Sequence, residues 1–292
     1  QILQSLPQAI QTMLDPADCG PACLSLCQDV QGETFEYPEE FFKERVHNIR
    51  RPKPDDFQIK QAVEKIKNSK NPIIISGGGV FYSDAMDELG NFAVKHNIPV
   101  TQTVMGYSTM KRDHSHFVGP IGGLGGKAAN NLAKETDLAI CIGTKLADFT
   151  TGSWANFENP QFKLVSINIA RHDANKHLAE AVIGDAKVSL IELSNALGDW
   201  RSSDSWHKKS QDELKSWNEY VDKESGPTNQ ELPSYAHAVG AIYRNSDPTD
   251  IAVTAAGGLV GEVVQVWRPK ELNTHETEWG FSCMSYEISG AL

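Results

Sequence analysis

The sequence predicts an α/β protein with a doubly wound parallel sheet, flanked by partial α/β domains. Short apolar segments of strand length alternate with amphipathic helical segments between residues 57 and 200. This alternation is typical of helices that cover both faces of a parallel sheet. A second, shorter alternation of helix and strand follows a polar stretch nearer the end of the chain.

The first 32 residues predict one helix and one strand. Leu6, Ile10 and Leu14 follow helical spacing, and proline at position 16 ends the helix because it disfavours helical geometry in the residue before it. Residues 21–29 are expected to form a short buried strand. One helix and one strand are too little to fold alone, so this segment is interpreted as the end of a larger domain.

Residues 33–56 are rich in Glu, Pro, Arg and Lys and are interpreted as a linker. Residues 57–200 are predicted to form a central Rossmann-like domain. Its expected helices lie around residues 59–66, 86–92, 128–133 and 188–197. Its expected strands are residues 72–76, 98–101, 138–143 and 163–169, which are mostly apolar, as strands buried on both faces are.

Residues 201–233 are polar and are interpreted as a second linker that contains helical stretches. From residue 234 a helix, a strand at 251–254, a glycine turn and a helix to Trp267 follow one another. A further helix is expected after Gly280. We interpret 234–292 as the start of a third domain, which is truncated.

The composition excludes several classes of partner. The formal net charge of −11 argues against nucleic acid and anionic membranes, because binding to phosphate requires a basic face. No apolar run approaches the roughly 18 residues that span a bilayer, and residues 1–4 do not resemble a signal peptide. We expect a cytoplasmic protein whose partner is a small molecule.

Neither the cysteines nor the paired histidines predict a metal site. Five cysteines in a chain of this length favour reduced thiols. The three-residue gaps between Cys19, Cys23 and Cys27 do not match structural zinc sites, which mostly have two-residue gaps and a second ligand pair. His114 and His116 lie in a predicted loop without a third ligand, so we expect solvated side chains.

Two glycine clusters raise the question of nucleotide binding. Gly77-Gly78-Gly79 follows a predicted strand, where backbone amides could cradle a phosphate, but a tight turn without ligand fits equally well. Residues 123–128 read Gly-Leu-Gly-Gly-Lys-Ala, a loose dinucleotide pattern with Asp148 as a candidate partner for a ribose. No clear strand precedes this second cluster. A non-catalytic nucleotide-binding module therefore remains an alternative.

Other common catalytic patterns are absent. The sequence has neither the glycine–serine–glycine turn of hydrolases nor a His-Glu-x-x-His segment. Asp113, Asp148 and Asp185 lie at expected strand or turn ends, where aspartate also caps helices. No catalytic residue is assigned in this chain.

The last sixty residues are the most informative. Residues 254–262 combine a strand end, a glycine turn and a helix start, which suits an anionic ligand at the carboxyl end of a strand. Residues 279–292 form a polar, sulfur-containing turn that leads into a segment of small residues.

Together these segments resemble thiamine-diphosphate-dependent enzymes of the acetolactate synthase group. The end of that family's pyrimidine-binding domain resembles residues 20–30, and the closing signature of its central domain resembles Gly184-Asp185-Ala186. The early turn of its diphosphate-binding domain resembles residues 281–286. Within the group, residues 14–21, 41–47 and 264–292 are most similar to ring-opening hydrolases of inositol catabolism, which act on a cyclic dione.

The resemblance implies the cofactors thiamine diphosphate and Mg²⁺ and a homodimer or homotetramer. It implies covalent catalysis by the cofactor, with the protein supplying positioning and electrostatics. It places Gly257, Gly258 and Leu259 near the diphosphate. It places Ser282, Cys283 and Met284 under the aminopyrimidine, with Met284 holding the cofactor bent. Ser285 is a departure, because the family usually has glycine there.

Two larger departures concern the chemistry. The family binds its metal through a Gly-Asp-Gly motif and a later Asn, and residues 184–186 and 198–200 lack the third glycine. The family's activating Glu lies in a region that would precede Gln1. We therefore expect no metal ligands here and an internal fragment that is inactive and binds no cofactor by itself. An acetolactate-synthase-like or oxo-acid decarboxylase relative remains an alternative.

Overall fold

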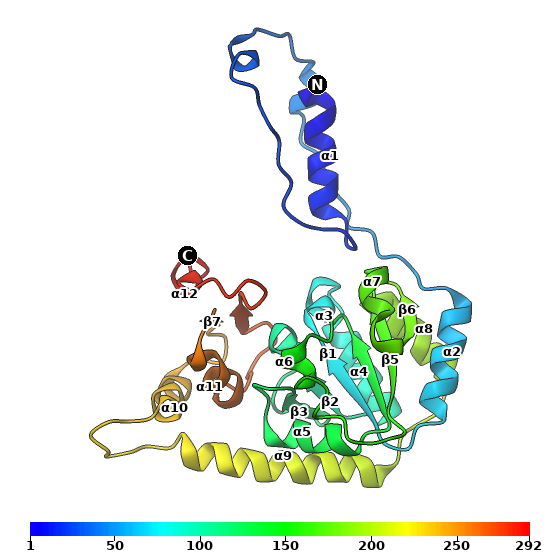
Figure 1. Ribbon diagram of the computed structural model, residues 1–292, viewed down its shortest axis with the longest axis vertical. Coiled ribbons are helices and arrows are strands. Elements are labelled where there is room, and N and C mark those ends of the chain that lie inside the picture. Colours follow the sequence, from blue (N-terminus) through cyan, green and yellow to red (C-terminus); the bar gives the residue numbers. More distant parts are fainter. The chain divides into compact units, whose positions relative to one another are not determined.

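The computed structural model describes residues 1–292, which divide into two compact units, Gln1–Pro52 and Lys53–Leu292 (Figure 1). The first unit contains the helix α1 (Ile2–Leu14) and the 3₁₀ turns η1 (Val30–Gly32) and η2 (Glu39–Phe42). The predicted first helix is confirmed. It ends where Asp15 adopts extended geometry before Pro16.

The prediction of a strand at residues 21–29 is wrong. Residues 19–27 have no regular structure, and Cys19, Cys23 and Cys27 are exposed rather than buried. A strand needs the backbone of a neighbouring strand to satisfy its N–H and C=O groups, and residues 1–52 contain no other strand. The apolar pattern of residues 21–29 alone was therefore insufficient to predict a strand.

The second unit is built on a six-stranded parallel sheet, which confirms the predicted fold class. The strand order is β3-β2-β1-β4-β5-β6, in which β1 and β4 are the central neighbours. The strands are β1 (Pro72–Ser76), β2 (Val100–Gln102), β3 (Phe117–Pro120), β4 (Leu138–Ile142), β5 (Lys163–Asn168) and β6 (Glu180–Ile183). The chain order reverses between β1 and β4, the point at which doubly wound sheets often bind ligands.

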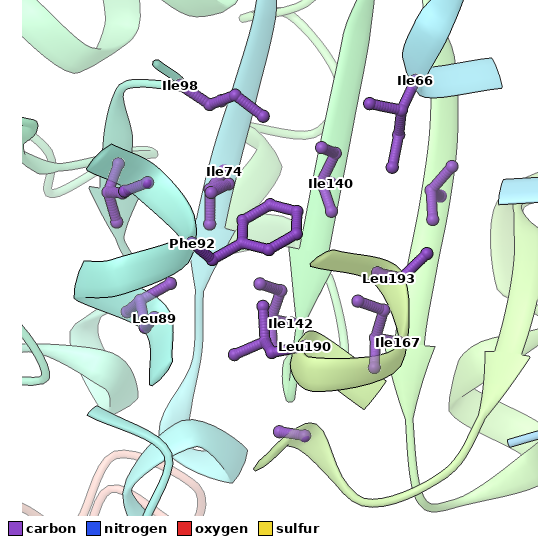
Figure 2. Close-up of a cluster of buried hydrophobic side chains, with 14 of the residues drawn as sticks. Ile66, Ile74, Leu89, Phe92, Ile98, Ile140, Ile142, Ile167, Leu190 and Leu193 are labelled. Carbon is purple, nitrogen blue, oxygen red and sulfur yellow. The ribbon is translucent and has the colours of Figure 1, made fainter. Parts of the chain in front are cut away.

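Helices cover both faces of this sheet (Figure 1). They are α2 (Asp56–Lys67), α3 (Gly78–Tyr82), α4 (Met86–His96), α5 (Lys127–Glu135), α6 (Asp148–Thr151), α7 (Arg171–Ala174) and α8 (Ala186–Leu197), with the 3₁₀ turns η3 (Val104–Gly106) and η4 (Lys176–Leu178). Alternate side chains of strand β4 face the hydrophobic cores on opposite sides of the sheet. Ile140 and Ile142 face the cluster under α2, α4 and α8, whereas Ala139 and Cys141 face the cluster under α5. Figure 2 shows the first cluster, where Phe92 and Leu190 pack against Ile74 and Ile142.

The polar stretch predicted as a linker at 201–233 consists largely of one helix, α9 (Asp204–Glu224). Ser203 caps it by accepting a hydrogen bond from the Trp206 amide at 3.3 Å. Trp206 is buried, and its Nε1 donates to the carbonyl of Pro72 at 2.9 Å. Only a few apolar side chains anchor this helix, so its sequence reads as polar.

The remaining residues form α10 (Tyr235–Asn245), β7 (Ala252–Thr254), α11 (Gly258–Val266), β8 (His275–Thr277) and α12 (Tyr286–Ser289). Strands β7 and β8 pair in parallel. The helices expected at 235–243 and up to Trp267 are confirmed, as is the strand at 251–254. No helix of the chain combines the length and apolarity needed to cross a bilayer.

A cluster of cations around one tyrosine joins the C-terminal segment to the sheet domain. The Tyr243 ring lies 4.7 Å from the Lys270 amine and within 6.0 Å of the guanidinium carbons of Arg112 and Arg268. The Tyr243 hydroxyl accepts from Arg112 and donates to the Arg268 carbonyl at 3.0 Å. The Arg112 amide also donates to the Pro269 carbonyl at 2.8 Å, so both backbone and side chains hold this junction.

The expectation of solvated histidines is wrong for His116, which is buried. Its ring stacks on His207 of α9 with 4.2 Å between centroids, and its Nε2 lies 3.2 Å from Asn97 Oδ1. No three metal-ligating side chains gather there or elsewhere in the chain. Desolvation and the neighbouring His207 lower the pKa of His116 to about 4.

The burial of His116 predicts that the free energy of unfolding decreases at acidic pH. Desolvation also lowers the pKa of His275 to about 4, against an ordinary value of 6.5. Both folded-state values lie below those of the unfolded chain, so protons favour unfolding, and stability falls as pH drops from 6.5 towards 4. Each histidine is expected to cost on the order of 1–2 kcal/mol by pH 5.

Urea unfolding at a series of pH values measures this effect. His116→Gln is expected to flatten the dependence of the unfolding free energy on pH between 6.5 and 4. His172→Gln, at an exposed position, is the matched control and is expected to leave it unchanged. Equal slopes for both variants would contradict the prediction.

Candidate cofactor site

The two predicted cofactor-binding segments leave one small sheet on the same side, at the carboxyl ends of its two strands. Strands β7 and β8 are parallel and in register, with Thr254 opposite Thr277. Residues 257–259 follow β7 and residues 282–284 follow β8, so both lie beyond the carboxyl ends of paired strands. The Glu278 amide donates to the Thr254 carbonyl at 3.3 Å and ties the two segments where they leave the strands.

The glycine turn before α11 fits an anionic group. Gly257 has a φ of +90°, a backbone conformation that residues other than glycine rarely adopt. It directly precedes the helix, whose first turn has no side-chain cap. A Cβ at Gly257 or Gly258 would meet no atom within 4 Å. The first amides of a helix attract negative charge, and here no side chain caps them. Leu259 is exposed at the same end.

The turn after β8 is shaped by one carboxylate. Glu278 accepts hydrogen bonds from the amides of Phe281 at 2.7 Å and Cys283 at 2.8 Å. These two bonds lower the pKa of Glu278 below its ordinary value. Ser282 and Met284 are exposed beyond it.

The backbone explains why glycine is favoured at the position of Ser285. This serine has a φ of +77°, in the left-handed region where a Cβ is strained. Ser285 is the first residue before α12, so the departure from the family pattern places strain at the end of the turn. The same residue type at position 282 has a φ of +52°.

The surroundings of Cys283 disfavour its thiolate. Desolvation and the neighbouring Glu278 carboxylate raise its pKa. A cationic neighbour would have the opposite effect, and the carboxylate disfavours the thiolate. Cys283 therefore offers a neutral, polarizable side chain, which agrees with a role in contacting a ring.

Apolar contacts fasten this site to the sheet domain. Val260 and Val264 of α11 pack with Val104, and Trp279 borders the same cluster. The Trp279 ring meets Phe149 edge to face, with 5.1 Å between centroids. The position of the turn is therefore set partly by the loop that contains α6.

Beneath the site lies a buried polar layer that the sequence did not reveal. His275 of β8 contacts Thr254 Oγ1 at 3.3 Å and packs edge to face on Tyr107. The adjoining cavity of about 30 Å³ is too small for a cofactor or a cyclic substrate. A hollow of about 530 Å³ is lined from α5, α9 and Gln265 of α11, and one of about 560 Å³ is lined mainly from α4 and residues 109–114. Neither is lined by a predicted cofactor residue.

The first glycine cluster is a packing device rather than a phosphate cradle. The Gly77 amide donates to the Ile142 carbonyl at 2.8 Å and the Gly79 amide to the Gly143 carbonyl at 2.9 Å. A Cβ on Gly79 would lie 2.6 Å from Gly143 Cα. The two turns therefore fill the crevice between β1 and β4, and the tight turn without ligand is the better interpretation.

The second glycine cluster is also internally bonded. Strand β3 directly precedes it, so the expectation that no strand stands there is wrong. However, Gly123 donates to the Phe149 carbonyl at 2.7 Å, Gly126 donates to the Pro120 carbonyl at 2.8 Å, and Asn130 Oδ1 accepts from Gly122 at 2.9 Å. These amides already have acceptors in Pro120, Asn130 of α5 and Phe149 of α6, which disfavours the nucleotide-binding alternative.

Asp185 caps α8, as its position suggested. Its carboxylate accepts from the amides of Lys187 and Val188 at 3.0 and 3.2 Å. Gly184 lets the incoming chain pass, since a Cβ there would lie 2.9 Å from Pro54. The Gly-Asp-Ala signature therefore has a structural rather than a metal-binding role in this domain.

Comparisons with known proteins agree with this architecture. Residues 59–193 match the family described as thiamine pyrophosphate enzyme, central domain. Three bacterial relatives are each named 3D-(3,5/4)-trihydroxycyclohexane-1,2-dione hydrolase. The protein of Clostridium perfringens strain 13 is 36% identical over 315 residues, covering 100% of this chain and 49% of its own length. That of Clostridium botulinum strain Alaska E43 is 38% identical, covering 99% and 48%. That of Bacillus anthracis is 37% identical, covering 100% and 49%. The chain thus spans about half the length of the curated relatives it matches.

Proposed function

We propose that this chain, whose residues 59–193 match the central domain of thiamine pyrophosphate enzymes, is part of a hydrolase that uses this cofactor, thiamine diphosphate. The proposed reaction is the ring opening of 3D-(3,5/4)-trihydroxycyclohexane-1,2-dione in myo-inositol degradation. The observation that carries this proposal is similarity along the whole chain to relatives of that name, at 36–38% identity. The similarity extends beyond residues 59–193, which thiamine pyrophosphate enzymes share.

In this proposal the turns that follow β7 and β8, at the carboxyl ends of the two strands, hold part of the cofactor. When bound, thiamine diphosphate supplies the nucleophilic carbon for breaking a carbon–carbon bond beside a ketone. Gly257, Gly258 and Leu259 contribute the turn and the helix start at which phosphate oxygens accept hydrogen bonds. Ser282, Cys283 and Met284 lie on the other side of the same edge and support the aminopyrimidine.

The metal is proposed to be held outside this chain's residues. No three metal-ligating side chains gather in the structure, and the sequence lacks the family's Gly-Asp-Gly motif. Mg²⁺ and a homodimer or homotetramer are therefore assigned to the whole enzyme.

A binding experiment follows from this division. The chain of 292 residues alone is expected to show no micromolar affinity for thiamine diphosphate, because a diphosphate without its metal is poorly neutralised. Calorimetric titration with thiamine diphosphate and Mg²⁺ measures it. A dissociation constant in the micromolar range would contradict the assignment of the metal site to other residues.

The activity is tested in the protein of which this chain is part. Incubation with the cyclic dione, cofactor and Mg²⁺ is expected to yield a ring-opened acid heavier by one water, detected by mass spectrometry. Turnover of pyruvate to carbon dioxide without turnover of the dione would instead support the acetolactate-synthase-like or decarboxylase alternative. A tightly bound nucleotide with neither activity would support the nucleotide-binding module.

A further inference from the structure

We propose that Glu278 is a positioning residue, which fixes the turn of residues 279–285 so that Ser282, Cys283 and Met284 are presented to the cofactor. This inference rests on the proposed function for what the turn contacts. The conformation of the turn and its dependence on Glu278 stand on the structure alone, and they are tested separately below.

The first support is how the carboxylate is bonded. Both oxygens of Glu278 accept from backbone amides, Oε1 from Phe281 at 2.7 Å and Oε2 from Cys283 at 2.8 Å. A carboxylate that closes a turn in this way fixes its geometry at two points, and hydrogen bonds to a charged acceptor are stronger than neutral ones.

The second support is that burial cannot hold this turn. Phe281 is 88% exposed and Met284 is 84% exposed, so neither gains much by packing. Ser282 and Ser285 both have positive φ, which costs on the order of 1 kcal/mol each and needs compensation nearby. The bonds to Glu278 span Ser282, whereas Ser285 is spanned by the hydrogen bond from the Tyr286 amide to the Cys283 carbonyl at 3.2 Å.

The third support is the fixed base from which Glu278 acts. Its own amide donates to Thr254 at the end of β7, and the next residue, Trp279, packs on Phe149. The carboxylate is thus anchored to the sheet edge that also carries Gly257. It can therefore set the turn relative to the glycine turn, which a residue within a free loop could not do.

Glu278→Gln is the test variant, and Glu276→Gln is its matched control. Both changes remove one negative charge from the same segment at nearly the same volume. Glu276 is exposed and its carboxylate contacts the Tyr286 hydroxyl at 3.3 Å, not the amides of the turn. Glu278→Asp, which is one methylene shorter, tests whether reach or charge matters.

Two measurements on the chain without cofactor report the turn itself. In Glu278→Gln the amides of Phe281 and Cys283 are expected to exchange hydrogen about tenfold faster than in the unchanged chain. Because the carboxylate raises the pKa of the Cys283 thiol, alkylation of Cys283 at pH 7.5 is expected to accelerate roughly threefold, with Cys19, Cys23 and Cys27 as internal references. Unchanged exchange and alkylation in Glu278→Gln, or equal changes in Glu276→Gln, would overturn the inference.

A third measurement connects the turn with the cofactor. In the protein of which this chain is part, Glu278→Gln is expected to raise the thiamine diphosphate concentration at half-maximal rate about tenfold, with a smaller change in the rate at saturation. The half-maximal concentration for Glu278→Asp is expected to lie between those for Glu278→Gln and the unchanged protein. If the turn loosens but cofactor dependence is unaltered, the positioning role is overturned. If no cofactor dependence exists in the unchanged protein, it is the proposed function that fails.

Discussion

Gly143→Ala is expected to destabilise the sheet domain by roughly 3 kcal/mol or more. Gly143 has a φ of +60°, and a Cβ there would lie 2.5 Å from Gly79 Cα and 2.8 Å from the Gly79 carbonyl carbon. These are backbone atoms, so no side chain can rotate away to make room. The turns after β1 and β4 would have to separate, which breaks the hydrogen bond from the Gly79 amide to Gly143. Urea unfolding followed by circular dichroism measures the loss.

Gly198→Ala separates the two causes of this effect. Gly198 has nearly the same φ, +63°, but a Cβ there would meet no atom within 4 Å. Its replacement is expected to cost about 1–2 kcal/mol, the penalty for a positive φ alone. If both variants lose equal stability, the close approach of the two turns contributes nothing and the interpretation of the first glycine cluster as a packing device is wrong.

Tyr243→Leu is expected to loosen the C-terminal segment by about 2–4 kcal/mol. The change removes a buried ring that lies among three cations and a hydroxyl that bonds Arg112 and the Arg268 carbonyl. Arg112 would then lack its hydroxyl acceptor. Hydrogen exchange of α10 and α11 measures the local opening free energy.

The control for this variant lies on the same helix. Tyr235 is exposed at the first turn of α10, so Tyr235→Leu is expected to change stability by less than about 0.5 kcal/mol. Amides of the sheet domain, such as those of β4, are expected to keep their protection in both variants. Faster exchange in β4 upon replacing Tyr243 would show that the segment and the sheet open together, against the local effect expected.

The fold was largely predictable because the central strands are apolar on both faces. Ile140 and Ile142 face one core while Ala139 and Cys141 face the other, which gives a continuous apolar run of strand length. Strand β3 was missed because Phe117-Val-Gly-Pro contains two residues that disfavour strands. Strand β8 was missed because His275, Glu276 and Thr277 are all polar. Tertiary pairing overrode local preference in both.

The site was only partly predictable. The glycine turn at residue 257 and the exposed turn at 282–284 followed from a family pattern, and their shared edge follows from the pairing of β7 with β8. The hydrogen bonds of Glu278 to the turn could not be foreseen. A carboxylate that accepts from amides three and five residues later has no sequence signature, because the bonds exist only once the turn has formed. His116 was misjudged for a similar reason, since α9 buries it from ninety residues away.

Helix α9 has a mechanical consequence. Its 21 residues form a rod of about 30 Å at the usual rise per residue. Near one end Trp206 is bonded to the first residue of β1, and near the other Val221 packs with Tyr243 and Trp267. A rod fixed at both ends resists stretching, so the separation between the sheet and the C-terminal segment has a set length. The helix therefore acts as a spacer between the sheet and the C-terminal segment, alongside the direct contact of Val104 with Val260 and Val264.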